Sequence, residues 1–221
     1  GLQFRQQVIR TEGTKFTNLI QNSNFLGTYT NQWSTDTNAT LDISKIGDYN
    51  CLISKVNVGQ RNLAITHHTL DLNAQHKYYF RATVGLENVD ATLQHQLIAG
   101  LKDFSKTVSY NVADGMITIS NIISGADTTK KFEVSAVLSE IASNWKLKLT
   151  QPMLLDLTAT FGDTITSTIE ELDKLPFFID DYTYTENFTV YKDMVSLTWN
   201  GLGIDTQDGA LSLSSAGGLE V

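Results

Sequence analysis

The stretch QPMLLDLTATFGDTITSTIEELDKLPFF, residues 151–178, decides the fold class of this chain. Its first part is an apolar run that ends at Leu157 and is typical of a buried strand. The tripeptide Phe161-Gly162-Asp163 then interrupts the apolar pattern with a glycine, which tolerates positive φ and favours a tight turn. A strand followed this closely by a turn predicts a definite supersecondary unit of a folded module.

A short helix should follow that turn. Ser167 with Glu170, and Thr168 with Glu171, both have the spacing of a capping box, in which a hydroxyl and a carboxylate three residues apart satisfy the first free amides of a helix. Pro176 should end the helix, because proline lacks the amide hydrogen that a helix interior needs.

Most of the remaining chain alternates apolar and polar residues with the period of two that half-buried strands show. Nine segments have this pattern: residues 40–43, 51–56, 62–69, 78–84, 94–101, 107–112, 116–119, 132–138 and 145–149. Two antiparallel sheets would bury the apolar side chains of such strands between them. We therefore expect an all-β jelly-roll sandwich with one short helix near the C-terminal end of the module and a β extension after it.

The chain divides by sequence into three parts. Residues 1–17 form an N-terminal extension, residues 18–178 the jelly-roll module, and residues 179–221 a C-terminal β extension with a Gly/Ser-rich tail. The tail beyond Gly201 offers little apolar surface to offset chain entropy, so we expect it to be dispensable for folding.

Composition and charge limit the partners. The net charge of −8 argues against binding to nucleic acid or anionic lipid, which requires a basic face, whereas a neutral saccharide is indifferent to it. Cys51 is the single cysteine, so an internal disulfide and a cysteine-based metal cluster are excluded. No apolar run approaches the roughly 20 residues of a membrane span, and nothing resembles a signal peptide. We expect a soluble protein.

Catalytic patterns are absent from the sequence. A glycoside hydrolase needs two carboxylates across a cleft, but most acidic residues here fall in predicted turns. His67 and His68 are neighbours on a predicted strand and should point to opposite faces, which excludes joint metal binding from that strand. Serine-nucleophile and phosphate-binding glycine motifs are missing. We expect that the protein is not an enzyme.

Three segments together resemble one family. Residues 18–25, NLIQNSNF, with Trp33 after them, residues 76–84, HKYYFRATV, and residues 156–178, with DLTATFG, TIEEL and a Pro-aromatic pair, occur in the order found in carbohydrate-binding-type jelly-roll modules. These modules belong to distal tail proteins and accessory baseplate proteins of siphophages that infect Gram-positive bacteria. The resemblance spans residues 18–178 and rests on order and spacing, since none of the segments is specific alone.

This resemblance implies a function. The module would bind host cell-wall polysaccharide without catalysis, would contact other phage tail or baseplate proteins, and would lie at the tail tip of the virion. Two alternatives stay open: a purely structural virion domain that has kept the jelly roll without a sugar site, and a glycan-degrading enzyme. Fold alone does not distinguish these classes.

Related jelly rolls often carry a structural calcium near the N-terminal turn. Here that turn reads Asn24-Phe25-Leu26 and lacks an acid, which leaves Asp156 on the closing strand as one carboxylate. We therefore expect no cofactor, and we expect Asp156 to cap or bridge the turn that follows it.

Strand parity indicates a candidate binding face. If Tyr78 and Phe80 face the core, their neighbours along the strand point outward, and the glutamines of the next strand do so as well. An aromatic ring can stack on a pyranose, while guanidinium and amide groups bind its hydroxyls. The exposed face of any sandwich carries such residues, so a structural role stays open. The candidate ligand-binding residues are Tyr79, Arg81, Gln94, Gln96 and, more weakly, Trp33, with the loops of Tyr29 and Tyr49 as a second choice.

Overall fold

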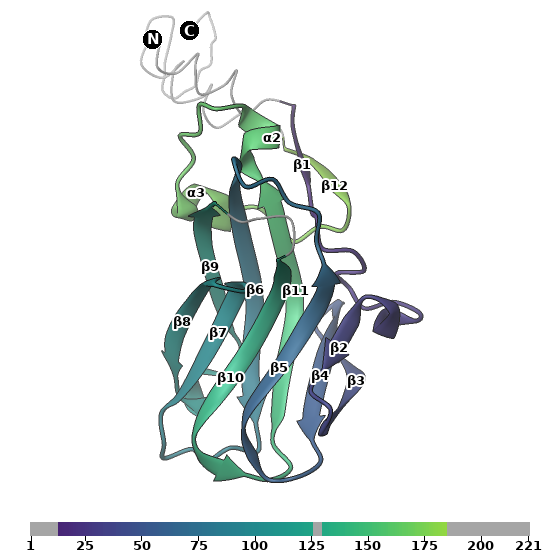
Figure 1. The fold of residues 1–221 in the computed structure, drawn as a ribbon, viewed down its shortest axis with the longest axis vertical. Coiled ribbons are helices and arrows are strands. Elements are labelled where there is room, and N and C mark those ends of the chain that lie inside the picture. The colour runs from purple at the N-terminus through teal and green to yellow at the C-terminus, as the bar shows by residue number, and fades with distance from the viewer. Residues whose placement is uncertain (1–12, 126–129, 185–221) are drawn as a thin grey trace, which may run out of the picture. The chain divides into compact units, whose positions relative to one another are not determined.

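The computed structural model describes residues 13–125 and 130–184, which form the two packed sheets of a jelly-roll sandwich (Figure 1). The chain divides into two units, one of residues 16–182, which contains both large sheets, and one of the flanking residues 1–15 and 183–221. The first unit includes all of the expected module, residues 18–178. The expected strands and the Gly/Ser-rich tail beyond residue 184 lie outside the described residues.

Each large sheet has five strands, and the paired strands within it are antiparallel. The first sheet has the order β2 (Trp33–Thr35), β5 (Gln60–Thr69), β10 (Lys131–Ala142), β7 (His95–Leu101) and β8 (Phe104–Tyr110). The second sheet has the order β3 (Ala39–Ile46), β4 (Tyr49–Val56), β11 (Lys146–Asp156), β6 (Lys77–Glu87) and β9 (Ile117–Ser124). A separate two-stranded sheet pairs β1 (Thr14–Thr17) with β12 (Asp181–Tyr184). The all-β jelly roll is confirmed, and each of the nine alternating segments contains a strand, although the strand in segment 107–112 ends at Tyr110.

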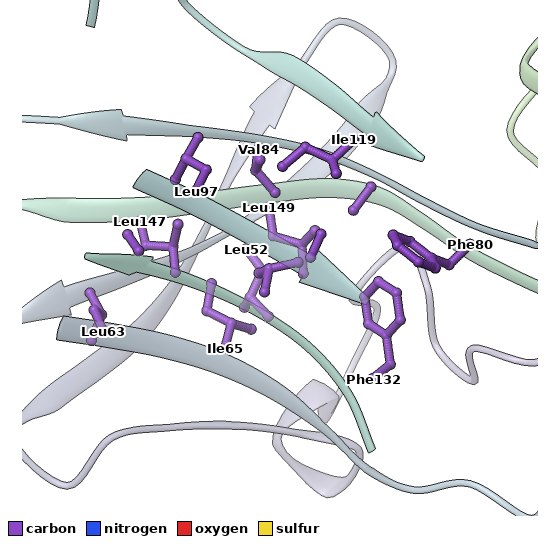
Figure 2. Packing of buried hydrophobic residues seen from close by; sticks show 14 of the residues in the cluster. Leu52, Leu63, Ile65, Phe80, Val84, Leu97, Ile119, Phe132, Leu147 and Leu149 are labelled. Carbon is purple, nitrogen blue, oxygen red and sulfur yellow. The ribbon is translucent and has the colours of Figure 1, made fainter. Parts of the chain in front are cut away.

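The core lies between the two large sheets, where alternate side chains of both interdigitate (Figure 2). Leu63, Ile65 and Phe132 of the first sheet face Leu52 and Leu149 of the second, and all are at most 1% exposed. Burying one such side chain contributes roughly 1.5–3 kcal/mol, so this layer stabilises the whole sandwich.

Strand β11 is longer than the sequence predicted. The alternating segment 145–149 and the apolar run that follows it belong to one strand, β11, whose register against β6 shifts between Thr150 and Met153. Gln151 has a φ of 54° at this point, and Pro152 has no amide hydrogen to donate to the ladder. The bulge accommodates both residues outside the regular pairing with β6, so the strand continues to Asp156.

Two short α-helices follow β11, where the sequence predicted one. The expected helix is α3 (Ile169–Asp173), with the predicted capping box of Thr168 and Glu171 and an end before Pro176. The additional helix is α2 (Leu157–Phe161). Its N-cap is Asp156, whose Oδ1 accepts from the Ala159 amide at 2.9 Å, so the prediction that Asp156 caps the next turn is confirmed. The shorter elements η1 (Tyr29–Asn31) and η2 (Val112–Asp114) are single 3-10 turns.

Asn18, the first residue of the NLIQNSNF segment, has a structural role, because its buried side chain forms hydrogen bonds with two distant segments of the backbone. Its Nδ2 donates to the carbonyls of Pro152 and Phe178, each at 3.1 Å, and its Oδ1 accepts from the Leu154 amide at 3.1 Å. The buried amide therefore fixes the bulge of β11 to the segment after α3.

No helix among the described residues is both long and apolar enough for a membrane crossing.

Candidate functional site

The candidate face on β6 is closed. Strand parity is as expected, because Tyr78 and Phe80 point into the core and Tyr79 and Arg81 point to the other side of the sheet. However, Tyr79 is 0% and Arg81 is 8% exposed, since α3 and the residues after it cover this part of the second sheet. The expectation that Tyr79 and Arg81 lie on an open face is therefore wrong.

Tyr79 and Arg81 hold α3 against the sheet. Tyr79 Oη donates to Asp173 Oδ1 at 2.6 Å. Arg81 Nη1 donates to the Asp173 carbonyl at 3.0 Å, and Nη2 to the Leu175 carbonyl at 2.9 Å, so the guanidinium binds the free carbonyls at the C-terminal end of α3. Burial, as the larger cause, and the hydrogen bond with Asp173, as the second, raise the pKa of Tyr79 far above its ordinary value of 10. We name this set of contacts the α3 clamp.

The other candidate residues are separated from Tyr79 and Arg81. Gln94 and Gln96 are exposed as expected, but Gln96 lies on β7 of the first sheet and Gln94 directly before it, so they do not share a face with β6. Trp33 is 1% exposed and packs edge-on against Phe25 and His67, with ring centroids 5.2 and 4.8 Å apart. Trp33 Nε1 donates to the Asn22 carbonyl at 3.1 Å, which is a packing role.

The second-choice loops do not form an aromatic site either. Tyr29 is half-buried and packs against the hydrophobic core. Tyr49 is also half-buried, and its ring lies edge-on to Phe177, with centroids 5.1 Å apart. Both rings thus stabilise the sandwich.

The first sheet presents a polar outer face. The registers of β5, β10, β7 and β8 place mostly polar side chains, with a few apolar ones, on the side away from the core. These outward residues include the polar Asn62, Thr66, Gln96, Ser105, Thr107, Ser109, Glu133 and Ser135 and the apolar Ala64, Ile98 and Val137. Asn62, Gln96, Thr107 and Ser109 are exposed. No outward position of this sheet carries Phe, Tyr or Trp within residues 13–125 and 130–184. We name it the polar face.

A pocket of about 550 Å³ lies at one end of the polar face. Its lining includes Ser34, Thr66, Lys102, Asp103, Lys130, Lys131 and Glu133. Glu133 and Thr66 are cross-strand partners on β10 and β5, and Thr66 Oγ1 donates to Glu133 Oε2 at 3.0 Å. Lys130 Nζ is 3.0 Å from Asp103 Oδ2. The pocket therefore combines hydroxyl, carboxylate and ammonium groups that already have fixed positions.

Sequence reasoning missed this pocket. The sequence predicts only that most acidic residues lie in turns, and the structure does place Asp103 in the turn between β7 and β8, with a φ of 71°. The alternation of β5 and β10 does place Thr66 and Glu133 on outward faces. Nothing local in the sequence pairs these two strands, which are separated by four other strands along the chain.

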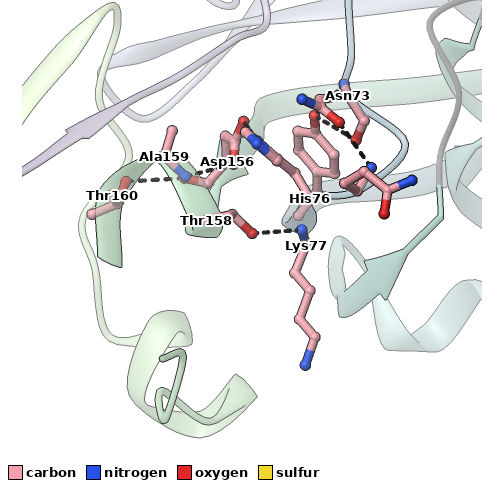
Figure 3. A network of polar contacts seen from close by, with 9 residues as sticks. Asn73, His76, Lys77, Asp156, Thr158, Ala159 and Thr160 are labelled. Carbon is pink, nitrogen blue, oxygen red and sulfur yellow. Dashed lines mark hydrogen bonds and ion pairs between the residues drawn. The ribbon is translucent and has the colours of Figure 1, made fainter. Parts of the chain in front are cut away.

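A second polar cluster joins the start of β6 to α2 (Figure 3). His76 Nδ1 lies 2.7 Å from Asp156 Oδ2, and the Lys77 amide donates to Thr158 Oγ1 at 2.9 Å. Because the other oxygen of Asp156 caps α2, both carboxylate oxygens bind protein groups. Within the part of the chain that the structure describes, no three His, Cys, Asp or Glu side chains are grouped so that they could hold a metal ion.

Comparisons with known proteins give likeness of fold. No protein-family model matches the chain, and no curated protein does. Among solved structures, an arabinose-bound α-L-arabinofuranosidase, MgGH51, matches with a TM-score of 0.53 at 13% identity, over 66% of this chain and 27% of that chain. A family 16 carbohydrate-binding module matches with a TM-score of 0.43 at 14% identity, over 63% of this chain and 100% of that chain. The N-terminal cellulose-binding domain of Cellulomonas fimi β-1,4-glucanase C matches with a TM-score of 0.40 at 14% identity, over 64% of this chain and 93% of that chain. Carbohydrate-binding modules are thus among the structures that this chain resembles.

Proposed function

We propose that this chain is a non-catalytic module that binds saccharide of the host cell wall for a phage that infects Gram-positive bacteria. The jelly-roll fold and the ordered segments at residues 18–33, 76–84 and 156–178 support this function. The proposal requires no cofactor. It places the chain at the tail tip of the virion, attached to other tail or baseplate proteins, where a symmetric assembly would multiply weak sites into avidity.

The observation that carries the proposal is the polar face with its pocket. Saccharide hydroxyls need donors and acceptors at fixed positions, and the face offers the amide of Gln96, the hydroxyls of Thr66 and Thr107, and the carboxylate of Glu133. The pocket volume of about 550 Å³ falls within the usual range for small-ligand sites. The proposed site therefore keeps Gln96 of the predicted residues and leaves out Tyr79 and Arg81, which lie on the opposite sheet.

A purely structural virion domain is the second candidate, and two observations favour it. The α3 clamp fills the face of β6 that carries the aromatic ring. The polar face lacks Phe, Tyr and Trp at its described outward positions, so ring stacking on a pyranose cannot contribute there.

Glycan hydrolysis has weaker support. The pocket contains Asp103 and Glu133, but Asp103 pairs with Lys130 and Glu133 accepts from Thr66. Both carboxylates thus already bind protein groups. A glycosidase instead needs two carboxyl groups that contact the substrate, one of them as a general acid and the other as a base or nucleophile.

The test compares two variants with matched substitutions on opposite sheets. Ser135→Arg places a long side chain at the centre of the polar face, beside Ile98 and Ala64. Thr118→Arg places the same side chain on the outer face of the second sheet, next to Thr83. Fluorescently labelled protein is incubated with a panel of Gram-positive strains, and the released reducing sugar is measured in parallel.

We expect wild-type protein and Thr118→Arg to label a restricted set of strains, and Ser135→Arg to lose most of the labelling. Failure of wild-type protein to label any strain would favour the structural domain. Release of reducing sugar would establish the enzyme instead. Equal labelling by both variants would show that the polar face is not the site.

A further inference from the structure

We propose that the pocket on the polar face binds an anionic substituent, a phosphate or a carboxylate, carried by a saccharide. The inference rests on the proposed saccharide-binding function and specifies its ligand class. It concerns the ammonium groups of the pocket, which the polar face elsewhere does not have.

The pocket has a local surplus of positive charge. Three lysines, Lys102, Lys130 and Lys131, line it together with two carboxylates, Asp103 and Glu133. The whole chain has a net charge of −8, so the sign of the charge in the pocket is opposite to the sign over the molecule. An anion that is repelled from most of the surface would therefore be attracted here.

The carboxylates of the pocket pair with one of its three lysines and leave the other two without an ion pair among the described residues. Asp103 pairs with Lys130, whose ammonium group also lies 5.5 Å from the centroid of the Phe104 ring. Lys102 and Lys131 are exposed and make no ion pair with any residue in 13–125 or 130–184. Their ammonium groups are available to a ligand.

The backbone holds Lys102 and Lys131 next to each other. The Lys102 amide donates to the Lys131 carbonyl at 3.1 Å, which joins the end of β7 to the start of β10. Two compact ammonium groups from adjacent chain segments can bind the oxygens of one phosphate or carboxylate.

The side of the pocket that Thr66 and Glu133 form suits a ligand hydroxyl rather than an anion. Thr66 donates to Glu133 Oε2, which leaves Glu133 Oε1 able to accept from a ligand hydroxyl. A bare anion that filled the pocket would be repelled by Glu133, because like charges at close range disfavour one another. The geometry therefore suits a sugar ring that donates a hydroxyl to Glu133 and directs its anionic substituent toward Lys102 and Lys131.

The experiment uses the full chain and a titration followed by NMR amide shifts, which measures millimolar affinities. The probes are glucose 6-phosphate, glucuronic acid, glucose and inorganic phosphate, at low and high ionic strength. The test variant is Lys102→Gln with Lys131→Gln. The control is Lys146→Gln, which removes a partly exposed lysine from the second sheet. Urea midpoints verify that both variants fold.

We expect one or both acidic sugars to bind at least about fivefold more tightly than glucose, and to lose at least about fivefold in the double variant and in high salt. Glucose 6-phosphate and glucuronic acid distinguish the phosphate from the carboxylate. Inorganic phosphate should bind more weakly than glucose 6-phosphate. Equal affinity for glucose and both acidic sugars would overturn the inference, and so would an unchanged affinity in the double variant.

The outcomes also separate this inference from the proposed function. Cell-wall labelling that persists in the double variant and in high salt would support saccharide binding and refute the anion pocket. Binding of an acidic sugar in the pocket by a protein that labels no cell wall would support the pocket and refute the cell-wall function.

Discussion

The α3 clamp allows a quantitative prediction for Arg81→Ala. The variant loses two well-formed hydrogen bonds from a buried guanidinium, to Asp173 O at 3.0 Å and Leu175 O at 2.9 Å, while a contact of 3.5 Å to Leu172 O is too long to count fully. A hydrogen bond that involves a charged group contributes about 1.5–3 kcal/mol, so the two sum to about 3–6 kcal/mol. The carbonyls can regain water if the end of α3 lifts from the sheet, which favours the lower limit, about 3 kcal/mol.

Urea denaturation at pH 7 measures this loss of unfolding free energy. Arg81→Lys should recover about half of it, because one ammonium group cannot reproduce the planar fork that reaches two carbonyls. Thr83→Ala, at the next outward position of β6, should cost less than about 1 kcal/mol, since Thr83 is half-buried and its hydroxyl shares a single hydrogen bond of 3.0 Å with Thr118 Oγ1 on the outer face of the sheet. An Arg81→Ala variant within about 0.5 kcal/mol of wild type would refute the clamp.

Three further predictions concern stability. Thr168→Ala removes the N-cap of α3 and should cost about 1 kcal/mol in urea denaturation, whereas Ser167→Ala, which the alternative capping box would make costly, should cost less. Gly100 has a φ of 142°, and an added Cβ would lie 2.7 Å from Phe104 O, so Gly100→Ala should lower the melting temperature more than Gly47→Ala, whose Cβ would meet nothing within 4 Å. Burial lowers the pKa of His67 to about 4, below the ordinary 6.5, so the unfolded state binds more protons and stability falls as pH drops from about 6.5 to 4, by up to about 3 kcal/mol. Unfolding free energy that stays constant over this range would contradict the last prediction.

The sequence predicted strands well because alternation is a local property. Residues 78–84 alternate between the core and the far side of their sheet, and the structure has Tyr78 and Phe80 in the core as this pattern requires. The capping box at Thr168 and the N-cap role of Asp156 were also predictable, since both are contacts over three residues. Helix α2 was missed because the apolar pattern of β11 continues into Leu157, which is equally buried at the start of a helix.

By itself, the sequence determined the class of fold, the strands and which side of each strand enters the core, because period and capping are encoded in residues a few positions apart. Only the tertiary structure decided what lies over the second side of each strand. Alternation cannot show that α3, about 90 residues after Tyr79 in the chain, covers Tyr79 and Arg81. It also cannot show that Gln96 belongs to the opposite sheet, or that Thr66, Lys102 and Glu133 from separate strands and turns line one pocket. Those contacts depend on strand order and long-range packing, and a site built from them is visible only once the two sheets are assembled.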